Sequence, residues 1–163
     1  MVAISLSEAS LGQIHNVNML AARLFSYFSN KEMLKKRVND IMPDVYSVNH
    51  DNILNSFLKN RFKSINQDDR LLFGKGKNGF IFPMQLQLRK LSWNTNDELI
   101  FISNVSSIKT KHSPTICIVD MEGDIKNVSS SFAWLFLKKF RNINMDKDVQ
   151  NIQMLIPSFF KVI

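Results

Sequence analysis

Residues Ile41 to Met84 have the sequence IMPDVYSVNHDNILNSFLKNRFKSINQDDRLLFGKGKNGFIFPM, and three features of this run indicate the fold. Met42-Pro43 marks the end of a short helix, because proline disfavours a helical conformation in the residue before it. Apolar residues then recur at helical spacing across residues 48–60. Farther on, the run from Gly74 to Gly79 separates two segments rich in apolar residues, a pattern typical of two strands joined by a hairpin turn.

The second of these segments alternates between apolar and polar residues. Each even-numbered residue from Phe82 to Leu88 is apolar, whereas Gln85 and Gln87 lie between them. Successive side chains of a strand point to opposite faces of the sheet. The segment therefore predicts a sheet with one buried face and one face that meets solvent in part.

The same signals, followed along the chain, predict the element order β-β-α-α-α-α-β-β-β for the first two thirds of the sequence. We expect strands at residues 3–7, 12–16, 65–74, 80–91 and 98–108. We expect helices at residues 19–28, 31–35, 37–41 and 48–60. This is an α+β domain with an antiparallel sheet.

The opening of the sequence recurs in its second half. Residues 11–18 (LGQIHNVN) correspond to residues 122–129 (EGDIKNVS), and residues 38–43 (VNDIMP) correspond to residues 152–157 (IQMLIP). Self-similarity of this kind indicates a repeated structural unit. We expect a complete unit over residues 1–109 and the N-terminal half of a second unit over residues 110–163.

The predicted second unit lacks a counterpart of the strands expected between residues 65 and 108. Half a sheet cannot bury its face or close its edge. We therefore expect either that the chain is a fragment of a longer protein or that a partner completes the second unit.

Local structure explains why two pairs of equivalent positions in the repeat carry these residue types. Gly12 and Gly123 fall at hairpin turns, where a positive φ is needed and glycine adopts it at low cost. Asn18 and Ser129 precede helical runs, where such side chains accept a hydrogen bond from a free helix N–H.

Composition excludes several classes of protein. The mean hydropathy is −0.09, and no apolar run approaches the about 18–20 residues of a membrane span. The N-terminus lacks the basic and apolar regions of a secretory signal. A single cysteine, Cys117, excludes an intrachain disulfide and a cysteine-based zinc site. The expected setting is the cytoplasm or the cytosolic face of a membrane.

The net charge of +7 raises the question of an anionic partner. The lysines and arginines are scattered in ones, twos and threes, and several alternate with apolar residues as on solvated faces. An excess of positive charge affects solubility and association in general and does not indicate a specific ligand. Nucleic-acid binding is not expected, and the expected partners are other protein chains or the rest of the same parent chain.

The ordered set Met42-Pro43, His50-Asp51, Asn78-Gly79 and Phe82-Pro83 resembles the PAS fold. In that fold a short helix ends in MP, the next helix opens with HD, and two strands join at a K-N-G turn before FP. The resemblance implies a five-stranded antiparallel sheet with helices on one face, followed here by the incomplete start of a second PAS unit. PAS domains are sensory and interaction modules.

Within the PAS class, the sequence resembles the tandem PAS segment of ciliate and amoebal multi-pass membrane proteins of the tiny macrocysts protein B type. The likeness covers nearly the whole chain. It rests on the residues above and on the runs 5–7, 24–27, 70–74 and 117–125. It implies a cytosolic module carried on a larger, membrane-associated protein.

The motifs are also similar to those of FixL-like haem-binding oxygen sensors. There the histidine of the HD pair ligates iron and an arginine twenty residues later lies on the distal side, which implies His50 as ligand and Arg70 as distal residue. An apolar pocket for the porphyrin would be lined by Leu54, Phe57, Ile81 and Leu88.

Several observations oppose a cofactor. HD pairs and this arginine also occur in PAS domains without haem, where the histidine starts the helix and the aspartate helps to cap it. Phe57 and Phe62 add bulk where a porphyrin would lie. Flavin photochemistry is excluded, because no reactive-cysteine helix motif is present and Cys117 falls in a predicted strand. We expect no cofactor, with haem as the alternative.

No phosphate-binding loop, nucleophile elbow or metal-binding pair is present, so no catalytic or metal-ligating residue is assigned. The sequence predicts a non-enzymatic PAS module for sensing or protein interaction. The alternatives are a haem-based gas sensor using His50 and a purely structural subunit of a large complex. PAS units commonly pair through the outer sheet face, which implies a PAS–PAS dimer interface at Gln85, Gln87, Arg89 and Trp93.

Overall fold

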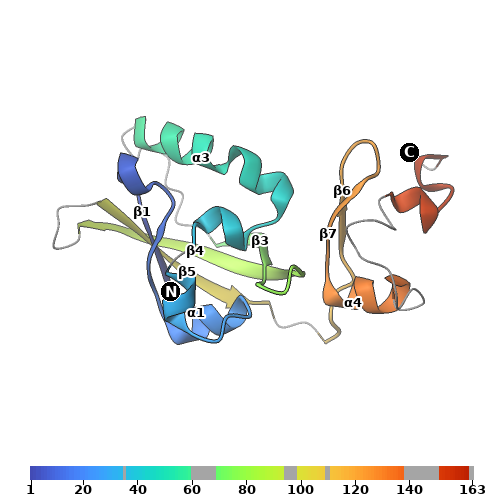
Figure 1. Cartoon of the computed structure of the whole chain (residues 1–163), viewed down its shortest axis with the longest axis horizontal. Helices are drawn as coiled ribbons and strands as arrows, with labels where there is room; N and C mark the ends of the chain where they lie inside the picture. The colour runs from blue at the N-terminus through green and yellow to red at the C-terminus, as the bar shows by residue number, and fades with distance from the viewer. Residues whose placement is uncertain (35, 60–68, 94–98, 109–110, 138–150, 162–163) are drawn as a thin grey trace. The chain divides into compact units, whose positions relative to one another are not determined.

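The computed structural model describes residues 1–34, 36–59, 69–93, 99–108, 111–137 and 151–161, and it describes their side chains except at 89–93, 137 and 161. The chain divides into two compact units, Met1–Lys109 and Thr110–Ile163. We call them unit 1 and unit 2 and describe each by itself (Figure 1).

Unit 1 is an α+β domain. Its sheet contains β1 (Val2–Ser5), β2 (Ile14–Val17), β3 (Arg70–Lys75), β4 (Ile81–Trp93) and β5 (Leu99–Ser107). A short 3-10 helix, η1 (Glu8–Ser10), lies between β1 and β2. Between β2 and β3 come α1 (Met19–Leu24), α2 (Asn30–Met33), the 3-10 helix η2 (Val38–Ile41) and α3 (Asp44–Lys59).

The five strands are antiparallel and have the spatial order β2-β1-β5-β4-β3. With its helices inserted between the second and third strands, this is the topology of the PAS fold. The predicted fold class is confirmed. Figure 1 shows β4 and β5 as the long strands of the sheet, with α3 running alongside it.

The helices and the sheet share one hydrophobic core. It draws on β1, β2 and β4 of the sheet and on α1, α2, η2 and α3. At its centre Phe25, which follows α1, is fully buried, and its ring meets that of Phe82 of β4 edge to face at 5.4 Å between centroids. Because every helix after β2 contributes to the same core, the helices cover one face of the sheet.

Some predicted helix bounds were wrong. α3 begins at Asp44, directly after Pro43, instead of at residue 48, since nothing after the proline interrupts the helix. α1 ends at Leu24 instead of residue 28, because Ser26 adopts a left-handed φ of 63°. The predicted beginning of the third strand at residue 65 lies outside the described residues.

Unit 2 repeats the opening of unit 1. It contains β6 (Cys117–Val119), β7 (Ile125–Val128) and α4 (Ser130–Phe132), which continues into the π-helical turn η3 (Ala133–Leu137). Two 3-10 helices, η5 (Ile152–Met154) and η6 (Phe159–Lys161), follow. β6 and β7 form a two-stranded antiparallel sheet.

The strand pairing is the same in both units. Val2 pairs with Val17 as Cys117 pairs with Val128. A β-bulge then interrupts each ladder at the same place, after Ala3 in β1 and after Ile118 in β6. The paired backbone of the second hairpin therefore follows that of the first, while the connection between its strands is shorter and contains no counterpart of η1.

The turns and caps are shared as well. Gly12 and Gly123 have φ values of 74° and 84°, so the predicted positive φ is confirmed at both. The side chains of Asn18 and Ser129 each accept a hydrogen bond from the N–H three residues later, which confirms the predicted helix caps. Among the described helices of both units, none combines the length and apolar character that crossing a bilayer requires.

Candidate functional site

His50 lies in the second turn of α3, one turn before Leu54, which is buried in the core. The imidazole is half-buried, and its Nδ1 atom is shielded from solvent without a hydrogen-bond partner among the described residues. Burial holds the pKa of His50 below its ordinary value of 6.5. The negative charge of Asp51 opposes this pKa shift and the positive charge of Arg37 adds to it.

Asp51 has a different role from the one its motif implied. One carboxylate oxygen accepts a hydrogen bond from Arg37 Nη2 at 2.9 Å, and the other accepts one from Asn39 Nδ2 at 3.2 Å. Because α3 begins at Asp44, the HD pair lies inside this helix and does not start it. Asp51 ties α3 to η2 instead of capping its own helix.

The space between α3 and the sheet is occupied by the protein's own side chains. Phe57 of α3 meets Phe101 of β5 edge to face, with 5.9 Å between ring centroids. The haem role of His50 stays a prediction, and the Phe57–Phe101 pair occupies part of the space that the predicted pocket assigns to a porphyrin. Arg70, the implied distal residue, is exposed at the beginning of β3, opposite Leu86.

The four predicted pocket residues lie in different surroundings. Leu54 belongs to the core and Phe57 packs against it. Ile81 is buried, but it alternates along β4 with Phe82, whose ring faces the core, so it projects to the other face of the sheet. Leu88 is half-buried beside the bulge that interrupts the β4–β5 pairing. A ligand pocket stays a prediction.

The outer face of the sheet can be identified from Gly74. A Cβ at Gly74 would lie 2.9 Å from the Phe25 ring, so Gly74 faces the core. Leu71 lies three residues earlier in the same strand and therefore faces outward, with Gln85 as its direct partner on β4.

This outer face carries an exposed leucine among polar side chains. Leu71 is 74% exposed. Gln85 and Gln87 are half-buried, and Gln85 Nε2 donates a hydrogen bond to Asp69 at 2.6 Å. Arg89 and Trp93, also predicted for the interface, belong to β4, but their side chains lie outside the described residues. Sequence reasoning missed Leu71, because its face becomes known only once the β3–β4 register is fixed.

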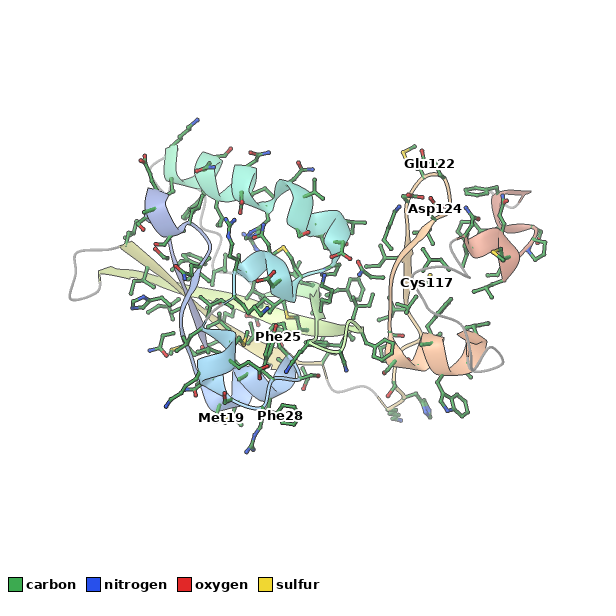
Figure 2. The ribbon with its side chains drawn as sticks, viewed as in Figure 1. Met19, Phe25, Phe28, Cys117, Glu122 and Asp124 are labelled. Atoms are coloured by element: carbon green, nitrogen blue, oxygen red, sulfur yellow. The ribbon has the colours of Figure 1, made fainter. Side chains whose placement is uncertain are left out.

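A group of acidic side chains marks the turn of the unit 2 hairpin, where Figure 2 labels Glu122 and Asp124. Asp120 is paired with Lys126 Nζ at 2.8 Å, and this hydrogen bond holds the pKa of Asp120 below its usual value. Asn151 Nδ2 donates to Glu122 O and to Asp124. These contacts close the turn. In the described part of the chain, no three His, Cys, Asp or Glu side chains are placed to share a metal ion.

No family model matches the chain. A protein from Dictyostelium discoideum named "Probable serine/threonine-protein kinase" is 29% identical over 152 residues, which are 90% of this chain and 9% of that protein. The chain therefore spans a small part of the length of this relative.

Among solved structures, the crystal structure of a PAS domain from a two-component sensor histidine kinase is similar, with a TM-score of 0.45 and 19% identity. The match covers 64% of this chain and 82% of that one. The fold of unit 1 is assigned from its own strand order and helix placement rather than from this likeness. That strand order makes unit 1 a domain with the PAS fold.

Proposed function

We propose that this chain is a non-enzymatic PAS module that acts by binding other protein chains, and that unit 1 pairs with a second PAS domain through its outer sheet face. The observation that carries the proposal is Leu71, which is 74% exposed beside Gln85 on that face. A leucine in this position loses its contact with water when a partner covers the sheet, and burial of a leucine contributes about 1.5–3 kcal/mol.

The polar neighbours suit a reversible interface. Gln85 and Gln87 offer side-chain amides that can bond across a contact or to water in the free protein. A face that mixes one exposed apolar residue with such amides remains soluble alone, and interfaces of non-obligate partners have this mixed character.

The test is the self-association of residues 1–163, measured by sedimentation velocity over a range of concentrations. Leu71→Lys should raise the dimer dissociation constant about 10- to 100-fold, because it removes one buried leucine and adds a charge. The matched control is Leu20→Lys on α1, since Leu20 is 75% exposed but lies away from the sheet's outer face. Equal effects of the two substitutions, or a wild-type protein that stays monomeric throughout, would contradict pairing through this face.

We infer that the module is a cytosolic segment of a larger membrane-associated protein. The support for this inference is the sequence resemblance to tandem PAS segments of tiny macrocysts protein B-type membrane proteins. Fractionation of cells with an antibody raised against residues 1–163 tests this inference. Recovery of the full-length protein in the membrane pellet, with its epitope accessible only after the membrane is opened, is the expected result. A protein recovered wholly in the supernatant contradicts it.

Haem-based sensing is the second candidate, favoured by the unpartnered Nδ1 of His50. Titration of the protein with haemin, followed in the Soret region, tests it. A ligand role for His50 requires a shifted band that His50→Ala abolishes and that His15→Ala, a substitution of an exposed histidine on β2, leaves intact. If Phe57 and Phe101 keep the site closed, the spectrum will be that of free haemin.

A further inference from the structure

Phe28 is the most exposed aromatic residue in the described part of unit 1, with 89% of its side chain open to solvent. It follows the turn that ends α1. In this turn Ser26 N–H donates a hydrogen bond to Arg23 O, and Tyr27 N–H donates one to Ala22 O, each at 2.9 Å. This pair of bonds, with a left-handed φ at Ser26, is a Schellman motif. The backbone that leads into Phe28 is therefore fixed.

The β3–β4 turn and α2 support the same segment. Lys77 N–H donates a hydrogen bond to Phe25 O at 2.9 Å. The Lys77 ammonium lies 5.5 Å from the centroid of the Phe28 ring and is ion-paired with Glu32 of α2. Directly after Phe28, the side chain of Ser29 caps α2 by accepting a hydrogen bond from Glu32 N–H at 3.3 Å. The exposed ring thus extends from a backbone that is held on both sides.

The exposed residues of α1 enlarge this apolar surface. Met19 is 41% exposed and Leu20 is 75% exposed. Arg23, also exposed, follows Leu20 by three residues and therefore lies beside it on the helix surface. In the view of Figure 2, the labelled Met19 and Phe28 lie along the same edge of unit 1. We call Met19, Leu20 and Phe28 the Phe28 face.

Positive charge surrounds the Phe28 face. Arg23, Lys31, Lys36 and Lys77 are all exposed. They outnumber Glu32, whose carboxylate is already paired: the hydrogen bond from Lys77 lowers the pKa of Glu32, and the positive charge of Lys36 adds to this shift. The net charge of the whole chain indicates no ligand, but here cations gather around exposed apolar side chains. This combination is complementary to an anionic surface that also has an apolar layer.

We propose that the Phe28 face docks unit 1 on a bilayer that contains anionic lipids. Phe28 and Leu20 enter the boundary between headgroups and acyl chains, and the surrounding cations contact the headgroups. A bilayer fits this composition better than a protein partner does. Lysine is depleted in protein–protein interfaces, whereas at a bilayer its stem lies along apolar surface while its ammonium stays in water. The role is separate from pairing through the outer sheet face.

The test is co-sedimentation of residues 1–163 with vesicles of phosphatidylcholine, prepared with and without phosphatidylserine. The protein should bind the anionic vesicles at least about tenfold more tightly than the neutral ones, and added salt should weaken this binding. Phe28→Ser should weaken it about 10- to 100-fold. The matched control is Val48→Ser on α3, because Val48 is 78% exposed and belongs to another helix of unit 1.

Two further variants separate the face from the total charge. Arg23→Glu and Lys59→Glu change the net charge equally, and Lys59 is exposed at the end of α3. Arg23→Glu should weaken binding to the anionic vesicles about tenfold, whereas Lys59→Glu should change it little. Since Phe28 is 89% exposed, Phe28→Ser should leave the unfolding temperature unchanged, which distinguishes lost binding from lost folding.

A gain of signal completes the test. Phe28→Trp keeps an apolar ring, so it should bind the anionic vesicles as the wild type does, and brominated phosphatidylcholine should quench its fluorescence more than that of Val48→Trp.

Equal binding to both kinds of vesicle overturns the proposal, as do equal effects of Phe28→Ser and Val48→Ser. Sedimentation velocity without vesicles examines the other occupant. If Phe28→Ser reduces self-association and the wild type binds no vesicles, the face contacts protein and the proposal is wrong.

Discussion

Arg37 and Asp51 join three segments of unit 1 at a single point. Arg37 Nη2 donates one hydrogen bond to Asp51 Oδ2 on α3 and another to the backbone carbonyl of Leu11 in the β1–β2 turn, each at 2.9 Å. Arg37 itself precedes η2. One guanidinium thus holds the hairpin turn, the 3-10 helix and the long helix together.

Arg37→Ala should destabilise unit 1 by about 1–2 kcal/mol. The ion pair is largely exposed and worth at most about 1 kcal/mol, and the bond to the Leu11 carbonyl adds about 1 kcal/mol. Chemical denaturation measures the change. Asp51→Asn should cost less, because it leaves the Leu11 contact intact. A larger loss for Asp51→Asn than for Arg37→Ala would contradict this order.

Gly74→Ala should destabilise unit 1 by about 1–3 kcal/mol through overpacking. The added methyl would lie 2.8 Å from the Phe82 ring and 2.9 Å from the Phe25 ring. Phe82→Leu should offset part of this loss in the double variant, which thermal denaturation measures.

Gly79→Ala provides the contrast. Apart from its two chain neighbours, no described residue has an atom within 4 Å of a Cβ at Gly79, but its φ is +82°. Its cost is therefore backbone strain, which Phe82→Leu should not offset and which Gly79→Asn should reduce, since asparagine tolerates this conformation. If Phe82→Leu offset the loss of stability equally in Gly74→Ala and in Gly79→Ala, the overpacking explanation would be contradicted.

The thiol of Cys117 should be unreactive in the folded protein. Burial raises the pKa of Cys117 from 9.0 to about 11. At about pH 8 this lowers the thiolate fraction about a hundredfold, and the thiolate is the reactive form. Reaction with a disulfide reagent should be slow in buffer and fast in denaturant. A rate in buffer equal to that in denaturant would contradict the burial of Cys117.

His50 should make unit 1 less stable in mild acid. Its pKa is lower in the folded protein, mainly through burial, than the ordinary value of 6.5 expected of the unfolded chain. Between these two pKa values the unfolded chain binds more protons, so stability is full above pH 6.5 and falls as the pH decreases towards the folded pKa.

The unfolding temperature from about pH 7 to about pH 5.5 measures this dependence. His50→Gln should make the unfolding temperature depend less on pH, whereas His15→Gln, at an exposed position, should leave the dependence unchanged. Arg37 lowers the pKa of folded His50, so Arg37→Ala should bring that pKa closer to 6.5 and make the loss of stability in mild acid smaller. A slope that His50→Gln does not alter would contradict the role of this histidine.

Much of the fold follows from local sequence. Gly12, Asn18 and the alternation from Phe82 onward each require one backbone conformation, and each was predicted correctly. The bounds of α1 and α3 were harder to predict from local sequence. Ser26 leaves the helical conformation although serine has no strong preference to do so, and Phe25 O accepts a hydrogen bond from the distant Lys77 N–H there.

The candidate site was harder to predict, because it depends on contacts between distant segments. The HD pair matches a known motif, yet Arg37 and Asn39 determine what Asp51 does. Leu71 and Leu72 are adjacent leucines, and only the register of β3 against β4 shows which one faces outward. The predicted pocket residues and the haem alternative remain predictions.

The shared opening of the two units bears on how the protein is made. The backbone hydrogen bond from Val38 N to Gly12 O recurs as Ile152 N to Gly123 O, at 2.8 Å in both. This hydrogen bond therefore forms both in unit 1, where further strands cover the hairpin, and in unit 2, where no described strand does. A chain emerging from the ribosome can therefore set the hairpin, the cap and the 3-10 helix before its covering strands are synthesised. In unit 1, the order of synthesis is then also the order of assembly.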